Sequence, residues 1–156
     1  MEDSKVATCL WFDGQAEEAA KFYTSLIPGS EITGVVRGGP DGPAVLVSFT
    51  LAGARFQGLN GGPQFHLSEA VSISVSTEDQ EETDRLWAAL TADGGSESDC
   101  SWLKDRFGLS WQIVPKALMR CLSDPDPEAS GRAMQAMMTM QKIDIATIEA
   151  AHRGTG

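Results

Sequence analysis

The residues best suited to chemistry gather in one stretch, SDCSWLKDRFGLSWQIVP, at residues 98–115. It holds a thiol at Cys100 and indole rings at Trp102 and Trp111. Aromatic rings beside small polar groups are typical of pockets for small organic ligands. A cysteine becomes a nucleophile only when a base or a lowered pKa activates it, and no histidine lies near Cys100 in the sequence. We therefore expect an inert thiol in the wall of a ligand pocket.

A hairpin is predicted to position these side chains. Strand-like runs at 100–104 and 109–114 flank a four-residue turn that ends in glycine. Asp105 and Arg106 in this turn are expected to form a solvated pair of little energetic weight. The face on which Trp111 lies depends on the turn geometry and stays open at this point. Both tryptophans of the hairpin would also suit a core, because large rings bury area with or without a ligand.

The same order of elements occurs twice along the chain: a strand, a helix that ends at glycine or proline, and further strands. The first strands of the two copies begin near Val6 and Val71, about 64 residues apart, which indicates a duplicated module. The predicted modules span about 5–60 and 69–150 within a single domain of 1–156. Each module alone covers one face of a small sheet, so two modules together are expected to curve into a cleft.

Local signals predict where the helices begin and how the chain ends. Asp13 is the predicted cap of the first helix, and Thr77 with Gln80 fits a capping box for the second. A helical segment with methionines along one side should follow Pro127. The run KIDIATI, Lys142–Ile148, reads as a last strand, and the tail after it is expected to fray. The predicted fold class is therefore α+β: two βαβββ modules form a barrel-like curved sheet with a cleft, and a C-terminal helical segment precedes the last strand.

Composition and charge exclude several classes of partner. The 156 residues carry 22 acidic and 12 basic side chains, for a net charge of −10. Nucleic acids and anionic membranes require clustered cations, so neither is expected as a partner. No apolar run is long enough to span a membrane, and the polar N-terminus is unlike a signal peptide. Three widely spaced cysteines without a Cys-x-x-Cys pair suit free thiols in a reducing cytoplasm.

Four segments together carry a family resemblance that spans nearly the whole chain. They are LWFDGQAEEAAKFY at 10–23, LNGGPQF at 59–65, DCSWLKDRFGLSWQIVP at 99–115 and MQKIDIATIEAA at 140–151. The chain resembles the PhnB-like branch of the vicinal-oxygen-chelate (glyoxalase/bleomycin-resistance) superfamily. Members of this branch often carry the label 3-demethylubiquinone-9 3-methyltransferase. The resemblance implies paired βαβββ modules around a pocket, and a homodimer.

The same resemblance places the metal ligands of metal-dependent relatives on this chain. They fall near Thr8, near Gln57, at Ala70 or Ser72, and at Asp144. This set offers one carboxylate and one amide but no imidazole, whereas a first-row transition metal needs several good donors. We therefore expect no catalytic metal and no other cofactor. Asp144 would otherwise be a buried, hydrogen-bonded carboxylate near the end of a sheet.

The leading prediction is a small-molecule-binding protein without a catalytic metal. The candidate ligand-binding residues combine aromatic, thiol and small polar side chains: Gln57, Ser72, Ser74, Cys100, Trp102, Trp111 and Asp144. One alternative is a metal-dependent lyase, isomerase or dioxygenase of the same superfamily. A second is the methyltransferase of the family label, although the glycine-rich fingerprint of an adenosyl-cofactor site is missing from the sequence.

Overall fold

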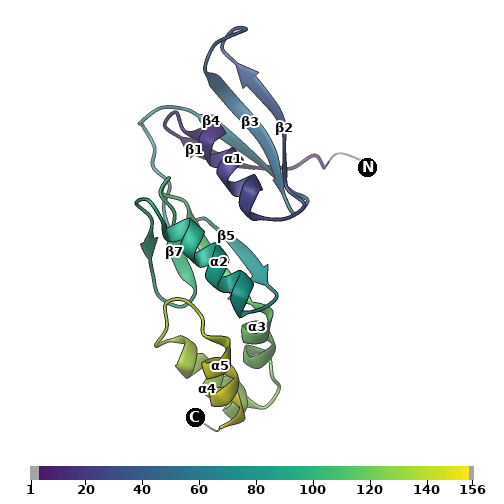
Figure 1. Ribbon diagram of the computed structural model, residues 1–156, viewed down its shortest axis with the longest axis vertical. Helices are drawn as coiled ribbons and strands as arrows, with labels where there is room; N and C mark the ends of the chain where they lie inside the picture. Colours follow the sequence, from purple (N-terminus) through teal and green to yellow (C-terminus); the bar gives the residue numbers. More distant parts are fainter. Residues whose placement is uncertain (1–3, 155–156) are drawn as a thin grey trace. The chain divides into compact units, whose positions relative to one another are not determined.

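The computed structural model describes residues 4–154. The chain divides into two compact units, Met1–Leu67 and Ser68–Gly156, and each unit has its own four-stranded sheet with a helix packed on one face (Figure 1). The α+β class and the paired modules are confirmed. The sheets remain two separate four-stranded sheets, so the predicted barrel-like sheet is not a closed barrel.

The first unit has the strand order β1-β4-β3-β2, in which β1 and β4 are parallel and the other pairs antiparallel. Its elements are β1 (Thr8–Phe12), α1 (Ala16–Leu26), β2 (Glu31–Arg37), β3 (Ala44–Leu51) and β4 (Ala54–Asn60). Along β1, Leu10 and Phe12 are buried on the face that α1 covers. Helix α1 approaches closely because β4 has no side chain at Gly58, where an added Cβ would lie 3.1 Å from the Ala16 Cβ.

The start of α1 differs from the prediction, because Asp13 does not cap it. The N-cap position is Gln15, which makes no side-chain cap. Instead, Asn60 at the end of β4 accepts a hydrogen bond from the Ala16 amide at 2.9 Å and donates one to the Ala44 carbonyl at 2.9 Å. A residue distant in sequence therefore satisfies the free amide of the first helical turn.

The LNGGPQF segment is explained by the packing of Trp11. The indole Nε1 donates to the Gly62 carbonyl at 2.9 Å, and the ring meets Phe65 edge-on at 4.9 Å between centroids. A Cβ at Gly61 would lie 2.3 Å from the Trp11 ring. Only glycine fits at that position.

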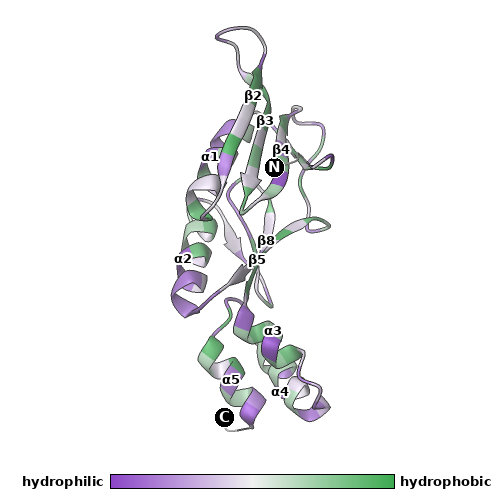
Figure 2. Cartoon of the chain, turned by 90° about the vertical axis from the view of Figure 1, so that its right-hand side faces the viewer, coloured by the Kyte–Doolittle hydropathy of each residue, from purple (hydrophilic) through white to green (hydrophobic). Residues whose placement is uncertain are grey.

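The second unit repeats the arrangement with the strand order β5-β8-β7-β6, and three further helices follow (Figure 1). Its elements are β5 (Ser72–Thr77), α2 (Gln80–Thr91), β6 (Ser96–Glu97), β7 (Trp102–Lys104), β8 (Ser110–Pro115), α3 (Lys116–Leu122), α4 (Pro127–Met137) and α5 (Ile145–Arg153). The Leu86, Trp87 and Leu90 side chains of α2 are buried, as are Trp111 and Ile113 of β8. Hydrophobic and hydrophilic positions alternate along α1 and α2 as expected for helices that cover one sheet face (Figure 2).

The predicted last strand is wrong, because Ile145–Arg153 is a helix. The Asp144 carboxylate caps it and accepts a hydrogen bond from the Thr147 amide at 3.0 Å. Ile143 and Ile148 are buried in a small core shared by α3, α4 and α5. Ile143 and Ile145 are two residues apart, which resembles the alternation of a strand and explains why a strand was predicted. The tail, which we expected to fray, is helical as far as Arg153, and His152 in it hydrogen-bonds Asp124 at 2.7 Å.

The capping box predicted at the start of α2 is replaced by a different set of bonds. Asp79 is the N-cap residue and accepts from the Glu82 amide at 2.9 Å, while the hydroxyls of Thr77 and Thr83 bond each other at 2.7 Å. The Gln80 side chain points to the C-terminal helices instead.

The turn of the hairpin also departs from the prediction of a solvated pair. Asp105 is buried, with 2% of its surface exposed. Its carboxylate accepts hydrogen bonds from the amides of Phe107 and Leu109 and from the Trp111 indole. The aspartate therefore organises the turn from inside.

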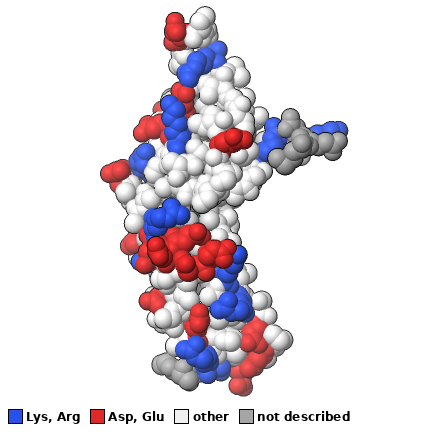
Figure 3. Space-filling view, turned by 45° about the vertical axis from the view of Figure 1, so that its right-hand side comes forward, with Lys and Arg blue, Asp and Glu red and all other residues white. Residues whose placement is uncertain are grey.

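The surface agrees with the charge argument. On the face shown in Figure 3, Lys and Arg side chains are scattered among acidic ones without forming a broad basic surface. Between residues 4 and 154, no helix has both the length and the apolar character needed to cross a membrane.

Candidate functional site

Each sheet has a face that its own helix leaves uncovered, here called the open face. In the second unit, the buried Trp111 and Ile113 of β8 lie on the helix-covered face, so Gln112 points to the open face. Strand register extends this face across the sheet, because Gln112 is paired with Ser74 of β5 and with Trp102 of β7. Three polar or aromatic side chains from three strands thus lie side by side.

A second row on the open face is formed by Ser72, Ser110 and Lys104. Ser110 is paired with Ser72 of β5 and with Lys104 of β7. The two rows are linked, since the Gln112 side-chain amide donates to the Ser72 hydroxyl at 2.9 Å. The predicted candidates Ser72, Ser74 and Trp102 therefore lie on the same face of the second sheet.

A pocket of about 130 Å³ opens at the edge of this face. It is lined by Glu69, Ser96, Glu97, Ser98, Trp102, Leu103, Lys104 and Ser110. The Ser110 hydroxyl is buried, and it is the only buried side-chain nitrogen or oxygen without a hydrogen-bond partner in the described part of the chain. A buried hydroxyl that makes no hydrogen bond is costly, so a hydrogen-bond partner at this position would be stabilising.

Charged groups also line this pocket. The Lys104 ammonium forms an ion pair with Glu69, and the Glu97 carboxylate accepts from the Trp87 indole at 2.6 Å. The hydrogen bond from Lys104 lowers the pKa of Glu69, so this carboxylate is ionised near neutral pH. Glu69 and Lys104 are both partly exposed, so their pairing is weak and a ligand can displace it.

The first unit presents a comparable open face. Gln57 of β4 is paired with Cys9 of β1 and with Ser48 of β3, on the side opposite the buried Leu10. The Cys9–Gln57 pair joins the parallel strands of the first module as Ser74–Gln112 joins those of the second. Gln112 is thus the counterpart of Gln57, and sequence reasoning missed it. The signal that could have revealed it is the duplication itself, applied to the fourth strand of each module.

The remaining predicted residues lie elsewhere. Trp111 is fully buried on the helix-covered face, and its indole donates to Asp105 at 2.9 Å. Cys100 lies in the loop before β7 and is partly buried. Asp144 is the cap of α5 and not a strand residue at a sheet end. Neither Trp111 nor Asp144 contributes to the open face of the second sheet.

The side chains that could hold a metal ion are dispersed in the described part of the chain. Within residues 4–154, no three side chains of His, Cys, Asp or Glu are grouped so that they could share an ion. On the open face of the second sheet, the parallel strands place Gln112 and Ser74 side by side. Their amide and hydroxyl groups are weak ligands for a first-row metal.

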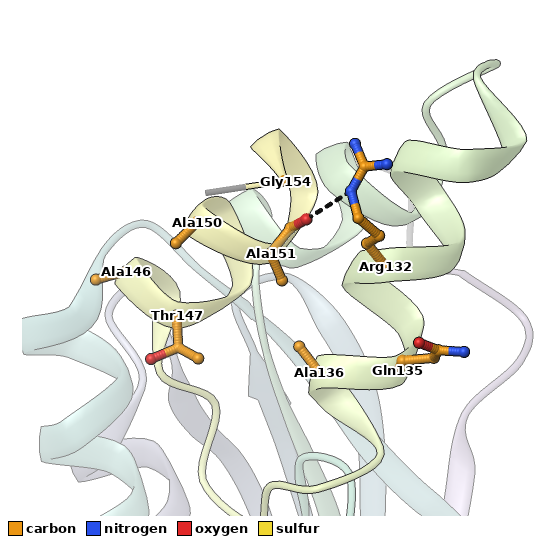
Figure 4. A pocket seen from close by; sticks show the side chains of 8 residues that line it. All are labelled: Arg132, Gln135, Ala136, Ala146, Thr147, Ala150, Ala151 and Gly154. Carbon is orange, nitrogen blue, oxygen red and sulfur yellow. Dashed lines mark hydrogen bonds between the residues drawn. The ribbon is translucent and has the colours of Figure 1, made fainter. Parts of the chain in front are cut away.

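Two further hollows involve the C-terminal helices. One lies between α4 and α5 and is lined largely by alanines (Figure 4). The Arg132 guanidinium at its edge donates to the carbonyls of Ala151 and His152, so it fastens the end of α5 to α4. The other hollow includes Asp144 together with the ion pair between Lys116 and Glu78. The polar groups named here already bond helix ends or form ion pairs. Unlike the Ser110 hydroxyl, they do not indicate a ligand.

The fold and the open faces define a paired-module α+β protein with a small polar and aromatic pocket. Comparison with known proteins agrees with the fold. The family described as 3-demethylubiquinone-9 3-methyltransferase matches residues 4–114. The chain belongs to this family. The resemblance that its sequence motifs indicated is therefore confirmed.

Of the similar solved structures described next, the first supports the same assignment. The PhnB protein of Bacillus cereus shares 32% identity and has a TM-score of 0.66, over 72% of this chain and 99% of that one. Protein PA1353 of Pseudomonas aeruginosa shares 19% identity over 72% and 98% of the two chains, with a TM-score of 0.59, and supports the fold alone. A glyoxalase/bleomycin resistance protein of Albidiferax ferrireducens shares 17% identity over 72% and 99%, with a TM-score of 0.49. No curated protein matches the chain significantly.

Proposed function

We propose that this protein binds a small organic ligand on the open face of its second sheet, without a catalytic metal or other cofactor. The observation that carries the proposal is the Ser110 hydroxyl, which is buried without a partner in the wall of a pocket. A ligand that offers a hydrogen-bond partner there would remove the cost of that unpaired group.

The surrounding groups suit such a ligand. The Trp102 ring supplies apolar and aromatic contact area, and the Gln112 amide lies in register beside it. The pocket is small, so it would take one end or one ring of a ligand rather than a large molecule. The methyltransferase activity in the family description finds no support in the sequence motifs, and calorimetry with S-adenosylmethionine tests it directly.

The test is a thermal-shift screen over a broad panel of small aromatic and polar compounds, followed by titration of the compounds that raise the melting temperature. We expect at least one compound to quench tryptophan fluorescence, and Trp102→Leu to weaken its binding at least tenfold. The matched control Trp11→Leu changes a tryptophan of the first unit. If the ligand binds in the pocket of the second unit, this variant should bind it within about threefold of the wild-type affinity. Failure of every compound to bind would contradict the proposal.

Metal content separates this proposal from the enzyme alternative of the same superfamily. We expect far less than one equivalent of zinc, nickel, manganese or iron in protein purified without a chelator or an affinity tag. A stoichiometric metal would favour a metal-dependent lyase, isomerase or dioxygenase.

We further propose a homodimer in the cytoplasm. The dimer is supported by large apolar side chains exposed on α3 and α4 and directly after α4, at Met119, Met134 and Met138. The cytoplasmic location is supported by three cysteines that are all free. Light scattering at micromolar concentration tests the dimer, and a monomeric mass would remove it.

A further inference from the structure

The connection between α4 and α5 (residues 138–144) is bonded to the loop that leads into the pocket. The carbonyl of Met140 accepts a hydrogen bond from the Cys100 amide at 2.9 Å, and the carbonyl of Gln141 accepts one from the Ser101 amide at 2.9 Å. These bonds join two segments about forty residues apart in the chain. The α4–α5 connection lies outside the residues 4–114 that match the family.

The loop held in this way has an unusual backbone. Cys100 and Ser101 have φ angles of +56° and +79°, in the left-handed region that residues with a Cβ rarely adopt. Neither residue is a glycine, so the conformation needs support from its surroundings. The two bonds from the α4–α5 connection give that support, because each one fixes the amide of a left-handed residue.

The backbone of this loop determines where Trp102 lies. The Ser101 carbonyl accepts from the Ile113 amide of β8 at 2.9 Å, and the next residue, Trp102, begins β7 in register with Gln112. A change in the loop backbone would therefore shift the first residue of β7. That residue supplies the aromatic wall of the pocket.

The connection is itself fastened to α2 through one side chain. The Gln80 amide donates to the Ile143 carbonyl at 2.9 Å, and its oxygen accepts from the Ile145 amide at 2.8 Å. Lys142 adds an ion pair with Asp84 at 2.8 Å, and Ile143 is fully buried. The Gln80 side chain thus bonds both backbone neighbours of Asp144.

We propose that the α4–α5 connection is a positioning element for the pocket: fastened by Gln80, it holds Cys100 and Ser101 in the left-handed conformation that orients Trp102. The C-terminal helices act on the ligand site through this backbone contact. The inference rests on the proposed function only where it concerns ligand binding, since the loop contact exists without a ligand.

The test uses the full chain with Gln80→Ala, which removes both Gln80 hydrogen bonds and leaves the ion pair between Lys142 and Asp84 in place. We expect amide hydrogen exchange at Cys100 and Ser101 to be at least tenfold faster, and iodoacetamide to alkylate Cys100 at least threefold faster. Peptide mass spectrometry follows each cysteine separately, and the exposed Cys9 of the first unit is the internal reference. Gln135→Ala, the same change at an exposed position on α4, is the matched control and should match the wild type.

A second readout follows Trp102 directly. In protein labelled with 5-fluorotryptophan, the Trp102 resonance, assigned by Trp102→Phe, should move in Gln80→Ala while the Trp11 resonance stays in place. If Gln80→Ala does not fold, Gln80→Asn keeps the amide on a side chain that is one methylene shorter and is expected to give a smaller change in the same direction.

Two results would overturn the inference. One is a folded Gln80→Ala variant in which exchange and alkylation at Cys100 proceed at the wild-type rates and the Trp102 resonance does not move. The other is equally faster exchange throughout β5 and β8, which would show general destabilisation and not positioning. Neither readout needs a ligand, so a screen without binders would contradict the proposed function and leave this inference standing.

Discussion

The Asp105 carboxylate accepts a hydrogen bond from the Trp111 indole at 2.9 Å, six residues further along the hairpin. Both side chains are almost completely buried. The other carboxylate oxygen accepts from the amides of Phe107 at 2.8 Å and Leu109 at 3.0 Å. One side chain therefore closes the turn and fixes the tryptophan on the helix-covered face, which leaves Gln112 for the open face.

Replacing Asp105 by alanine should strongly destabilise the second unit. The substitution leaves three donors without their acceptor, two of them in fully buried bonds, and we expect a loss of about 3 kcal/mol in the free energy of unfolding. Urea denaturation followed by tryptophan fluorescence measures this loss. Asp13→Ala removes an exposed aspartate and should stay within about 0.5 kcal/mol of the wild type; equal effects of the two substitutions would refute the assigned role of Asp105.

Asn60→Ala should weaken the start of α1. The substitution removes the acceptor for the Ala16 amide and the donor to the Ala44 carbonyl, so we expect a cost of about 2 kcal/mol. Hydrogen exchange at the Ala16 amide should accelerate more than exchange in α2. If Asp13→Ala proved the more harmful of the two changes, Asp13 would be the cap after all.

Asp144→Ala tests the corrected role of this carboxylate. As the N-cap of α5, it should contribute about 1 kcal/mol to stability through its bond to the Thr147 amide. Asp144→Ser keeps a capping oxygen and should restore most of the loss, whereas a metal ligand would not be replaced by serine. The measurement is thermal unfolding of both variants beside the wild type, with metal content determined in each.

Ser110→Ala should separate stability from binding. Removing an unpartnered buried hydroxyl is expected to raise the free energy of unfolding by about 1 kcal/mol. The same substitution should lower the affinity for any compound found in the screen, because the pocket loses the hydroxyl that a ligand would bond. Ser130→Ala, on α4, serves as the control and should leave the affinity unchanged; a Ser110→Ala variant that binds as tightly as the wild type would rule out contact with the hydroxyl.

Acid should loosen the contact between Asp124 and His152. The Asp126 amide and the His152 ring lower the pKa of Asp124. A carboxyl with a lower pKa in the folded state contributes stability above its unfolded pKa and loses it as the pH falls through the folded value. Between about pH 5 and pH 2, the wild type should therefore lose more stability than Asp124→Asn.

The comparison is made by urea denaturation at closely spaced pH values. His152→Gln keeps the backbone bond from Asp126 and should remove only part of the difference. Identical pH dependence in the wild type and Asp124→Asn would show that this carboxyl does not contribute.

Much of the fold could be predicted because the signals were local. The alternation in β5, the apolar stripe of α1 and the Asp126–Pro127 start of α4 each depend on neighbouring residues, and each agrees with the structure. The segment near Asp144, which we predicted to be a strand, fits two interpretations when only the local sequence is considered. Its isoleucine spacing suits a strand, and its capping aspartate and alanines suit a helix.

The sequence by itself determined the duplicated α+β modules, the family and three members of one open face, Ser72, Ser74 and Trp102. Strand alternation is a property of the chain and can be read without a structure. Only the tertiary structure decided which face Trp111 takes, since that depends on a turn closed by the buried Asp105. It also decided the roles of Gln80 and Asn60, because each bonds backbone groups distant in the sequence, and such contacts leave no periodic signal.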